Sequence, residues 1–414
     1  SNVERFADEA VVIGPAPASL SYLNHDAVLA AAAETGADAI HPGYGFLSEN
    51  AEFARKVQAA GLIWVGPSPD AIDLMGDKSR ARKAAIDAGV PVLAGTEGAL
   101  DTSGDIESIA DGIGYPLFVK ASAGGGGRGM RRIDARENVR STVEVAQAEA
   151  QAAFNSSDVY FERFVNHARH VEVQIFGDGE TFVHLGDRDC SMQRRQQKVI
   201  EEAPAPGIPD ELRQRMRETS VQLGRQSGYL GAGTVEFLYD PARQEVAFIE
   251  MNTRLQVEHP ISEAITGIDL VREQLRVASG EKLGYTQDDI EFSGHAFEFR
   301  INAEDPDNNF MPSPGRIDKL EIAGGPGVRV DFGFSAGQTV MPFYDSLLGK
   351  LIVWAADRDQ ALARAERALG ETEIEGIKTT VPLMRRLIAL DDFAAAKHYT
   401  TYIESVPGLL GETA

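Results

Sequence analysis

The stretch from Phe248 to Pro260 constrains the fold more than any other part of this sequence. Side chains of a strand point alternately to its two faces. The residues that we expect on one face are Phe248, Glu250, Asn252 and Arg254. A carboxylate, an amide and a guanidinium in one row, followed by the carboxylate of Glu258, do not suit the buried face of a simple sheet. We therefore predict that this strand lines a binding or catalytic site.

A hairpin of residues 234–239 and 245–253 is predicted around this strand. In this pairing Glu236 lies opposite Glu250, and carboxylates about 5 Å apart repel each other unless a cation lies between them. With Asn252 nearby, the oxygen ligands suit Mg²⁺ or Mn²⁺ shared with substrate phosphates. The alternative is a solvated sheet face with two glutamates, but the apolar neighbours of these residues favour the metal site.

A glycine-rich loop lies between two predicted strands, residues 116–120 and 131–133. Its glycines let backbone N–H groups approach phosphates closely, and Lys120 adds positive charge. A dinucleotide-binding motif is excluded because a strand, and not a helix, follows the loop. The alternative is a flexible surface loop. The glycines are Gly124, Gly125, Gly126, Gly127 and Gly129.

A basic cluster is predicted in the polar segment 187–198, which we expect to be a loop. Arg194, Arg195 and Lys198 gather there in a chain of net charge -23, so an anion site is one interpretation. A loop held by salt bridges to the following glutamates is the other.

The order of the remaining patterns predicts several domains, because 414 residues exceed one core. A βαβ rhythm, with strands at 11–13, 37–40 and 62–65, indicates a parallel sheet. The predicted helices cover 26–35, 68–88, 136–154, 268–278, 360–369 and 380–390, with one more starting at Pro209. The other predicted strands are 159–163, 170–176 and 295–302, with a β-meander over 324–349. The expected domain bounds are 1–90, 91–164 and 165–408, with a tail at 409–414.

Composition excludes several classes of protein. The acidic balance argues against nucleic acid as a partner. Cys190 is the single cysteine, which rules out an intrachain disulfide and a Cys-rich zinc site, and we expect it to be a packed residue. No run of 18 apolar residues predicts a membrane span, and we expect a cytoplasmic protein. A structural role explains His170 as well as a functional one does, and it explains His259 better, because Pro260 fixes the turn there.

With these residues in hand, the chain resembles biotin carboxylase, an ATP-grasp ligase, from about residue 8 to its last helices. The resemblance rests on ordered motifs across the chain. They are His41–Asn50, Met75-Gly76-Asp77-Lys78, Lys120-Ala121-Ser122 with the glycine loop, Arg188–Arg195, Glu201–Pro204, Glu250–Arg254 with Gln256–Pro260, and Arg300–Pro306. The implied fold is a multidomain α/β and α+β protein: a truncated, doubly wound N-terminal domain, a small lid, and a C-terminal mixed sheet.

The family's chemistry implies a role for each candidate residue. ATP phosphorylates bicarbonate to carboxyphosphate, which yields CO₂ and phosphate, and biotin is then carboxylated. The implied catalytic residues are Glu258 as general base, Arg254 and Lys198 on bicarbonate, and Arg300 on the biotin enolate. Gln256 and Val257 should also contact bicarbonate. The implied nucleotide-binding residues are Lys78, Lys120, Gly124 to Gly127, Glu162, Arg163, Val165, His170, Gln193, Gln196 and Leu238. Glu236, Glu250 and Asn252 should hold Mg²⁺ or Mn²⁺.

Three departures from the family pattern stand out. Gln196 occupies a position near the nucleotide where many relatives have His, which loses a titratable group. The family's first strand and helix are absent from this sequence, and with them part of the surface that relatives use to dimerise. No Met-Lys-Met biotinylation site occurs, so the biotin carrier should be another polypeptide or a region not included.

The resemblance also implies partners. They are a biotin carboxyl carrier protein or domain, a carboxyltransferase that selects the final acyl acceptor, and a second copy of the chain. Two other functions are open at this point. One is another ATP-grasp carboxylate or carbamate ligase, and the other is a nucleotide-binding subunit without catalytic activity, which Gln196 and the missing first unit would explain.

Overall fold

The chain folds into two compact units in this computed structural model. Unit 1 contains Ser1–Val90 and His167–Ala414, and unit 2 contains Pro91–Asn166, so unit 2 is inserted into the sequence of unit 1. The residues that the structure describes are 6–96, 98–122, 130–154 and 156–410.

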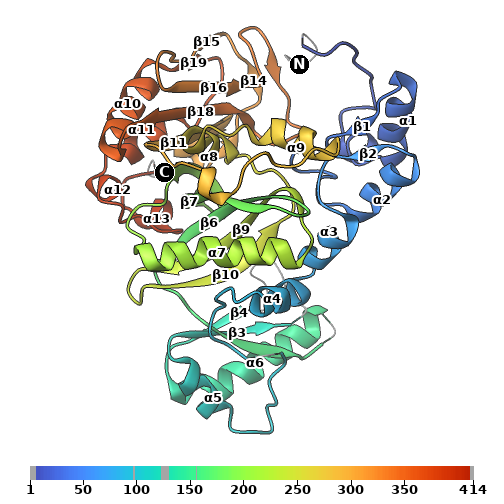
Figure 1. The fold of residues 1–414 in the computed structure, drawn as a ribbon. Coiled ribbons are helices and arrows are strands. Elements are labelled where there is room, and N and C mark those ends of the chain that lie inside the picture. Colours follow the sequence, from blue (N-terminus) through green and yellow to red (C-terminus); the bar gives the residue numbers. More distant parts are fainter. Residues whose placement is uncertain (1–5, 97, 123–129, 155, 411–414) are drawn as a thin grey trace. The chain divides into compact units, whose positions relative to one another are not determined.

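Unit 1 is organised by an eight-stranded antiparallel sheet with the order β10-β9-β6-β7-β8-β11-β18-β16 (Figure 1). The strands are β6 (Arg169–Asp178), β7 (Phe182–Arg194), β8 (Gln197–Ala203), β9 (Leu230–Asp240), β10 (Glu245–Asn252), β11 (His295–Asn302), β16 (Val328–Phe332) and β18 (Leu347–Ala355). The predicted strands at 170–176 and 295–302 and the predicted hairpin of β9 and β10 are confirmed. The central strands are buried on both faces, because helices cover one face and charged side chains fill much of the other.

The predicted polar loop over residues 187–198 is wrong, because this segment is a β-hairpin. β7 continues to Arg194, and β8 starts at Gln197. Arg195 and Gln196 form the two-residue turn with φ angles of 48° and 68°, the positive values that tight hairpins require. The polar residues of this segment suggested a loop, but only those at the hairpin end face water. Arg188 and Lys198 instead face a buried cluster of charges.

Helices pack on this sheet along its length. α7 (Asp210–Gln226) lies along β6 and β7 (Figure 1). α8 (His259–Thr266) packs on β7, β8, β11 and β18, and α10 (Arg358–Glu371) packs on β11 and β18. The remaining helices after α8 are α9 (Leu270–Ala278), α11 (Val381–Ile388), α12 (Asp391–Ala394) and α13 (Tyr402–Ser405). The helices predicted at 268–278, 360–369 and 380–390 are therefore present.

The N-terminal part of unit 1 has the predicted parallel βαβ arrangement. β1 (Ala39–Ile40) and β2 (Ile63–Trp64) are parallel, with α2 (Ala51–Ala59) between them in sequence. α1 (His25–Thr35) precedes them and ends at Gly36, as predicted. The strand predicted at residues 11–13 does not form.

The helix predicted over residues 68–88 is two helices. They are α3 (Pro69–Gly76) and α4 (Lys78–Asp87). Asp77 separates them because its backbone is extended and its side chain accepts a hydrogen bond from Arg80 N, which caps α4. Lys78 is therefore the first residue of a helix.

Short strand pairs complete the C-terminal part of unit 1. They are β12 (Glu304–Asp305) with β13 (Met311–Pro312), β14 (Gly315–Arg316) with β17 (Thr339–Val340), and β15 (Lys319–Glu321) with β19 (Glu373–Glu375). The predicted meander over 324–349 is wrong, because β16 pairs with β18 and β17 pairs with β14. Among the described residues, no helix combines the length and apolar character needed to span a membrane.

Unit 2 is a three-stranded sheet with helices against it. The strand order is β4-β3-β5, with β3 (Leu117–Ala121), β4 (Met130–Ile133) and β5 (Val159–Arg163). The helices are α5 (Ile106–Ile113) and α6 (Val139–Phe154), with a 3-10 turn, η3 (Arg136–Asn138), before α6. β3 and β4 are antiparallel, which confirms that a strand follows the glycine loop. The predicted phosphate loop, Gly124 to Gly127, lies outside the described residues.

Candidate active site

The β9–β10 hairpin brings two predicted metal ligands together. Glu236 and Glu250 are paired directly across the two strands, as predicted. The register shifts between Phe248 and Glu250, and such a bulge reverses the alternation of side chains. The prediction that Phe248 shares a face with Glu250 and Asn252 is therefore wrong. Arg254 lies beyond the end of β10, so its position is set by the following loop.

The carboxylate of Glu236 is surrounded by donors. Its Oε1 accepts hydrogen bonds from Asn252 Nδ2 (2.9 Å) and Gln256 Nε2 (2.8 Å), and it lies 3.3 Å from Lys198 Nζ. Its Oε2 lies 3.0 Å from His170 Nε2. Burial raises the pKa of Glu236, but Lys198 and His170 outweigh burial and hold that pKa below its usual range.

Glu250 lacks such partners. Within the described part of the chain, its carboxylate makes no hydrogen bond or ion pair. Burial, and then the neighbouring charge of Glu236, raise the pKa of Glu250, while Lys78 opposes them. A divalent cation between the two carboxylates would relieve this repulsion, and carboxylate and amide oxygens are suitable ligands for Mg²⁺ or Mn²⁺. The residues present therefore fit the predicted cation.

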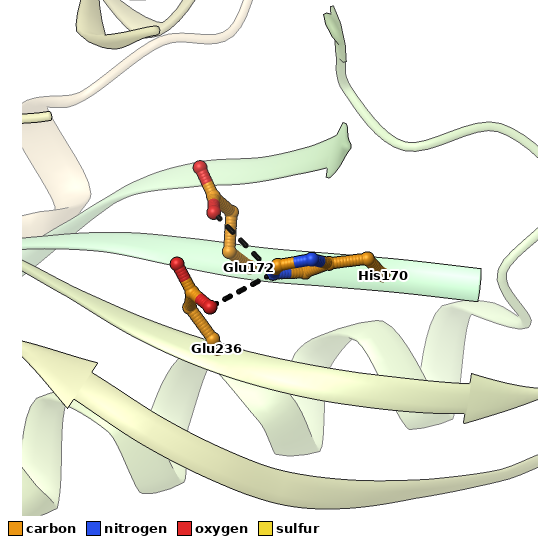
Figure 2. A group of neighbouring side chains, drawn as sticks. All are labelled: His170, Glu172 and Glu236. Atoms are coloured by element: carbon orange, nitrogen blue, oxygen red, sulfur yellow. Dashed lines mark ion pairs between the residues drawn. The ribbon is translucent and has the colours of Figure 1, made fainter. Parts of the chain in front are cut away.

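A second acidic group lies beside this pair. Figure 2 shows the imidazole of His170 directed toward Glu172, on the same strand, and Glu236, on β9. The three ligand atoms lie within 4.8 Å of one another. Glu172 also accepts hydrogen bonds from Arg188 and Lys198, so cationic side chains already neutralise it. We therefore favour the Glu236–Glu250 pair for the metal.

Lys198 is the cation on which three carboxylates converge. Its Nζ lies 2.7 Å from Glu172 Oε2, 3.3 Å from Glu236 Oε1 and 2.5 Å from Glu258 Oε1. Burial disfavours the ammonium form, yet the acidic groups around it, Cys190 and these three carboxylates, raise the pKa of Lys198 well above its usual value. Lys198 is therefore charged at neutral pH.

Arg188 stands behind this cluster and is fully buried. It donates to the carboxylate of Glu172 (2.6 Å) and to the side-chain oxygens of Gln174 (2.6 Å), Ser262 (3.0 Å) and Gln256 (3.0 Å). A further bond reaches Thr234 Oγ1 at 3.2 Å. Arg188 thus ties the strands that carry the cluster to one another and to α8.

Glu258, directly before α8, is held by two cations. Its Oε1 accepts from Lys198, and its Oε2 accepts from Arg300 at 2.7 Å. Burial raises the pKa of Glu258, but Lys198, Arg300 and Arg188 lower it well below its usual range. Arg300 also donates to Glu201 Oε1 at 2.5 Å. Glu258 is therefore an ionised, buried carboxylate between the two cations.

Arg254 lies on the other side of the cluster. Its Nε donates to Glu49 at 2.8 Å, and its second terminal nitrogen donates to Asn252 Oδ1 at 3.1 Å. Gln256 links the two halves of the site, because it donates to Glu236 and accepts from Arg188. Several guanidinium and ammonium groups can bind a small anion, and the ionised carboxylate between them can remove its proton.

Three family models match consecutive parts of the chain. They are the biotin carboxylase N-terminal domain over residues 1–72, the carbamoyl-phosphate synthase L chain ATP-binding domain over 77–286, and the biotin carboxylase C-terminal domain over 298–405. The biotin carboxylase of Pseudomonas aeruginosa is 51% identical over 97% of this chain and 90% of its own length.

The chain belongs to the biotin carboxylase family. The biotin carboxylase of Haemophilus influenzae is 50% identical over 97% of this chain and 90% of its own length. A solved relative is the biotin carboxylase domain dimer of Hydrogenobacter thermophilus 2-oxoglutarate carboxylase with MgADP, ADP and bicarbonate. It has a TM-score of 0.86 and 43% identity, covering 99% of this chain and 90% of that chain.

Membership in the biotin carboxylase family confirms the predicted ATP-grasp fold and the predicted enzyme class, an ATP-dependent ligase. The structure brings together Lys198, Arg254, Gln256, Glu258 and Arg300. Val257 lies among them, and its carbonyl accepts a hydrogen bond from Lys350 Nζ at 2.6 Å.

The predicted basic cluster is divided, which corrects the expectation of one anion-binding loop. Lys198 faces the carboxylates from β8. Arg194 instead donates to Asn309 and lies over the ring of Phe310, 4.1 Å from its centroid. The backbone N–H of Arg195 donates to Glu404 at 3.0 Å. Neighbours on a hairpin end point to different sides, so closeness in sequence did not bring these cations to one site.

The nucleotide-binding candidates of unit 1 lie on its strands and on α4. Gln193 Nε2 donates to Cys190 O at 3.2 Å and lies 3.4 Å from His170 Nδ1. Leu238 is paired with His170 across β9 and β6. Gln196 is exposed in the hairpin turn, and Lys78 is exposed at the start of α4.

The candidates of unit 2 lie on the paired strands β3 and β5 or directly after β5. Lys120, on β3, forms an ion pair with Glu162, on β5. Arg163 Nε donates to Ile113 O at 3.0 Å, and Val165 follows β5 as a half-buried residue. The ammonium group of Lys120, which was predicted to bind phosphate, is thus paired with Glu162 in this structure.

Sequence reasoning missed three residues of the site. Glu172 shares the polar face of β6 with His170, and that alternation could have identified it. Arg188 was assigned to a loop, although alternation over the segment would have placed it on a strand. Glu49 comes from a distant loop, and the sequence contains no local signal that it reaches Arg254.

Proposed function

We propose that this chain uses ATP to carboxylate biotin with bicarbonate through carboxyphosphate. The observation that carries the proposal is the buried carboxylate of Glu258 between Lys198 and Arg300, in a chain of the biotin carboxylase family. Such a group suits the removal of a proton from a bound anion, because the surrounding cations first attract the anion.

In the first step, bicarbonate would be bound by four residues: Lys198, Arg254, Gln256 and Val257. Glu258 takes the bicarbonate proton, and the freed oxygen attacks the γ-phosphorus of ATP while ADP leaves. The low pKa of Glu258 keeps it ionised but makes it a weak base at rest. An anion that attracts Lys198 would loosen its contact with Glu258 and raise the basicity of the carboxylate.

In the second step, carboxyphosphate separates into CO₂ and phosphate. Phosphate takes the N1′ proton of biotin, and the resulting enolate attacks CO₂ to form the new C–N bond. Arg300 would stabilise the enolate oxygen, since its guanidinium already lies beside Glu258, 2.7 Å from Oε2. The same residue therefore contacts the base of the first step and the substrate of the second.

We propose nucleotide-binding residues within each unit, as the family resemblance implies. In unit 1 these are Lys78, His170, Gln193, Gln196 and Leu238; in unit 2 they are Lys120, Glu162, Arg163, Val165 and the glycines Gly124 to Gly127. Glu236 and Glu250, with Asn252, would hold Mg²⁺ or Mn²⁺, which neutralises charge on the transferring phosphoryl group.

We further infer three partners. A biotin carboxyl carrier protein or domain would present the biotin, and a carboxyltransferase would pass the carboxyl group to the final acceptor. A homodimer is proposed because a relative of 43% identity is a dimer in its crystal structure. Light scattering of the purified chain, and carboxylation of an added biotinylated carrier, test these partners.

The deciding experiment is ATP hydrolysis in the presence of bicarbonate, with and without free biotin. We expect hydrolysis to require bicarbonate and to rise with biotin. ATP binding without any biotin response would overturn the proposal. Hydrolysis with carbamate but not bicarbonate would favour another ATP-grasp ligase, and binding without hydrolysis would favour a non-catalytic protein.

A further inference from the structure

Two glutamates face each other directly behind Arg300. Glu201 on β8 is paired with Glu298 on β11, and opposed side chains in antiparallel strands lie about 5 Å apart at Cβ. Both residues are 0% exposed to solvent. Arg300 follows two residues after Glu298, so it lies on the same face of β11.

The hydrogen bonds of this pair are incomplete. Glu201 Oε1 accepts from Arg300 Nε at 2.5 Å. Within the described part of the chain, Glu201 Oε2 and both carboxyl oxygens of Glu298 have no hydrogen-bond partner. An ionised carboxylate buried without donors is very costly, whereas a protonated one can donate to a neighbouring carboxylate.

The nearest cation on the adjacent strand does not neutralise Glu298. Lys350, on β18, donates to Val257 O at 2.6 Å and lies 3.9 Å from Asp331 Oδ2. The charged and titratable groups that act on Glu298 from the surrounding elements are Glu201 on β8, Arg300 on β11, Lys350 on β18, Glu258 before α8, and Tyr44 in the loop before α2.

The next residue on β8 shows the contrast. Glu202 is also buried, but it lies on the opposite face and is paired with Phe297. Its carboxylate accepts from His295 Nε2 at 2.8 Å and from Arg358 at 2.7 and 3.1 Å. The fully hydrogen-bonded carboxylate of Glu202 thus lies next in sequence to Glu201, whose pairing with Glu298 leaves carboxyl oxygens without a partner in the described part of the chain.

We propose that Glu298 is a positioning residue of this site. Its carboxyl group is protonated and donates a hydrogen bond to Glu201 Oε2. The pair then bears one negative charge, and Glu201 keeps its other oxygen for Arg300. Arg300 is thereby held between Glu201 and Glu258, where it can reach the biotin enolate. The inference rests on the proposed function in assigning Arg300 to biotin.

The electrostatics agree with this arrangement. Burial raises the pKa of Glu298 well above its usual value, with Glu201 adding to the shift and Lys350 opposing it. Burial also raises the pKa of Glu201 to about 7, although Arg300 opposes that shift. Loss of the proton at alkaline pH would place two charges beside Arg300 and draw its guanidinium away from Glu258 and biotin.

Glu298→Gln provides the central test, because the amide can donate to Glu201 Oε2 but cannot ionise. At pH 7 we expect its kcat/KM for free biotin to stay within about twofold of wild type. Between pH 7 and 9 the KM for biotin should rise in the wild type and stay nearly flat in Glu298→Gln. The Kd for ATP should have the same pH dependence in both proteins, because neither Arg300 nor Glu298 is among the proposed nucleotide-binding residues.

Two further variants keep the test informative. Glu298→Leu cannot donate, so its kcat/KM for biotin should fall about tenfold at every pH. Glu202→Gln should lower thermal stability without changing the pH dependence of the biotin KM. Equal pH profiles for wild type and Glu298→Gln, or full activity of Glu298→Leu, would overturn the proposal.

Infrared spectroscopy tests the proton without using turnover. The carbonyl band of a protonated carboxylic acid should be present at pH 7 in the wild type and weaker in Glu298→Gln. If that band does not change, Glu298 holds no proton and the inference fails. If the band changes but biotin never stimulates ATP hydrolysis, the proposed function fails while the protonated carboxyl stands.

Discussion

At the scale of single residues, the site is a set of buried charges that neutralise one another. Lys198 serves three carboxylates, and Glu258 is shared by two cations. Removing one partner from such a set leaves another buried charge without compensation. The same residues therefore contribute both to stability and to the proposed chemistry.

Replacing Glu258 tests the proposed base. Glu258→Gln keeps the shape but cannot accept the bicarbonate proton, so ATP hydrolysis dependent on bicarbonate should fall at least about 100-fold. The Kd for ATP, measured by calorimetry, should stay within about twofold. Glu263→Gln, one turn later on α8, is the matched control and should keep turnover. Near-normal turnover of Glu258→Gln would show that another group removes the proton.

Replacing Arg188 tests the buried network. Arg188→Leu leaves the carboxylate of Glu172 without its shortest donor, and we expect a loss of about 3–5 kcal/mol in the free energy of unfolding. Arg194→Leu, near the end of the same strand, removes a partly exposed guanidinium and should cost less than about 1 kcal/mol. Urea denaturation measures both. Equal losses would mean that burial of Arg188 does not matter.

Part of the site was predictable and part was not. The opposition of Glu236 and Glu250 follows from strand pairing, and the structure shows it. Roles for Arg254, Glu258 and Arg300 came from the family resemblance, since no local pattern specifies what a cation binds. Glu49 could not be found, because it meets Arg254 across 205 positions of sequence.

At the scale of secondary structure, predictions succeeded where apolar residues alternate with polar ones. They failed at the β7–β8 hairpin, where most residues are polar or charged. β9, β10 and β11 carry apolar residues at regular spacing, so their strands were predicted. β7 and β8 carry mainly polar residues at the hairpin, and the interpretation as a loop assumed that polar residues face water. A bulge in β10 likewise changes faces in a way that periodicity alone cannot indicate.

The hairpin turn between β7 and β8 provides a prediction at this scale. Gln196 has φ of 68°, which favours glycine, so Gln196→Gly should raise the free energy of unfolding by about 0.5–1 kcal/mol. Thermal and urea unfolding measure this gain. If the Gln196 side chain binds the nucleotide, the Kd for ATP will rise in the same variant. A stability loss would show that the turn does not need this conformation.

At the scale of the whole molecule, the buried carboxyl groups make stability depend on pH in two opposite ways. Arg169 and His398 outweigh burial and hold the pKa of Asp189 below its usual range, and the pKa of Glu258 is lowered as well. Their stabilisation is present above the unfolded carboxyl pKa of about 4 and is lost as pH falls through the folded value. Glu298 acts in the opposite sense.

Because the folded pKa of Glu298 is raised, its contribution is fully present below the unfolded pKa and is lost as pH rises toward the folded value. The free energy of unfolding of Glu298→Gln relative to wild type should therefore increase steadily from pH 5 to pH 8, by up to about 1.4 kcal/mol per pH unit. The difference in Tm between the two proteins should increase with it. Differential scanning fluorimetry over this range measures it. A constant difference in Tm would contradict the assignment.

The insertion of unit 2 into the sequence of unit 1 has a consequence for how the protein is made. On the ribosome, Pro91–Asn166 is complete long before β18, which lies next to the edge strand of the large sheet, has been synthesised. We expect unit 2 to fold first during translation, because the first 90 residues cannot complete unit 1 until its later strands have been synthesised. Nascent chains stalled after residue 200 should then protect unit 2 alone from proteolysis.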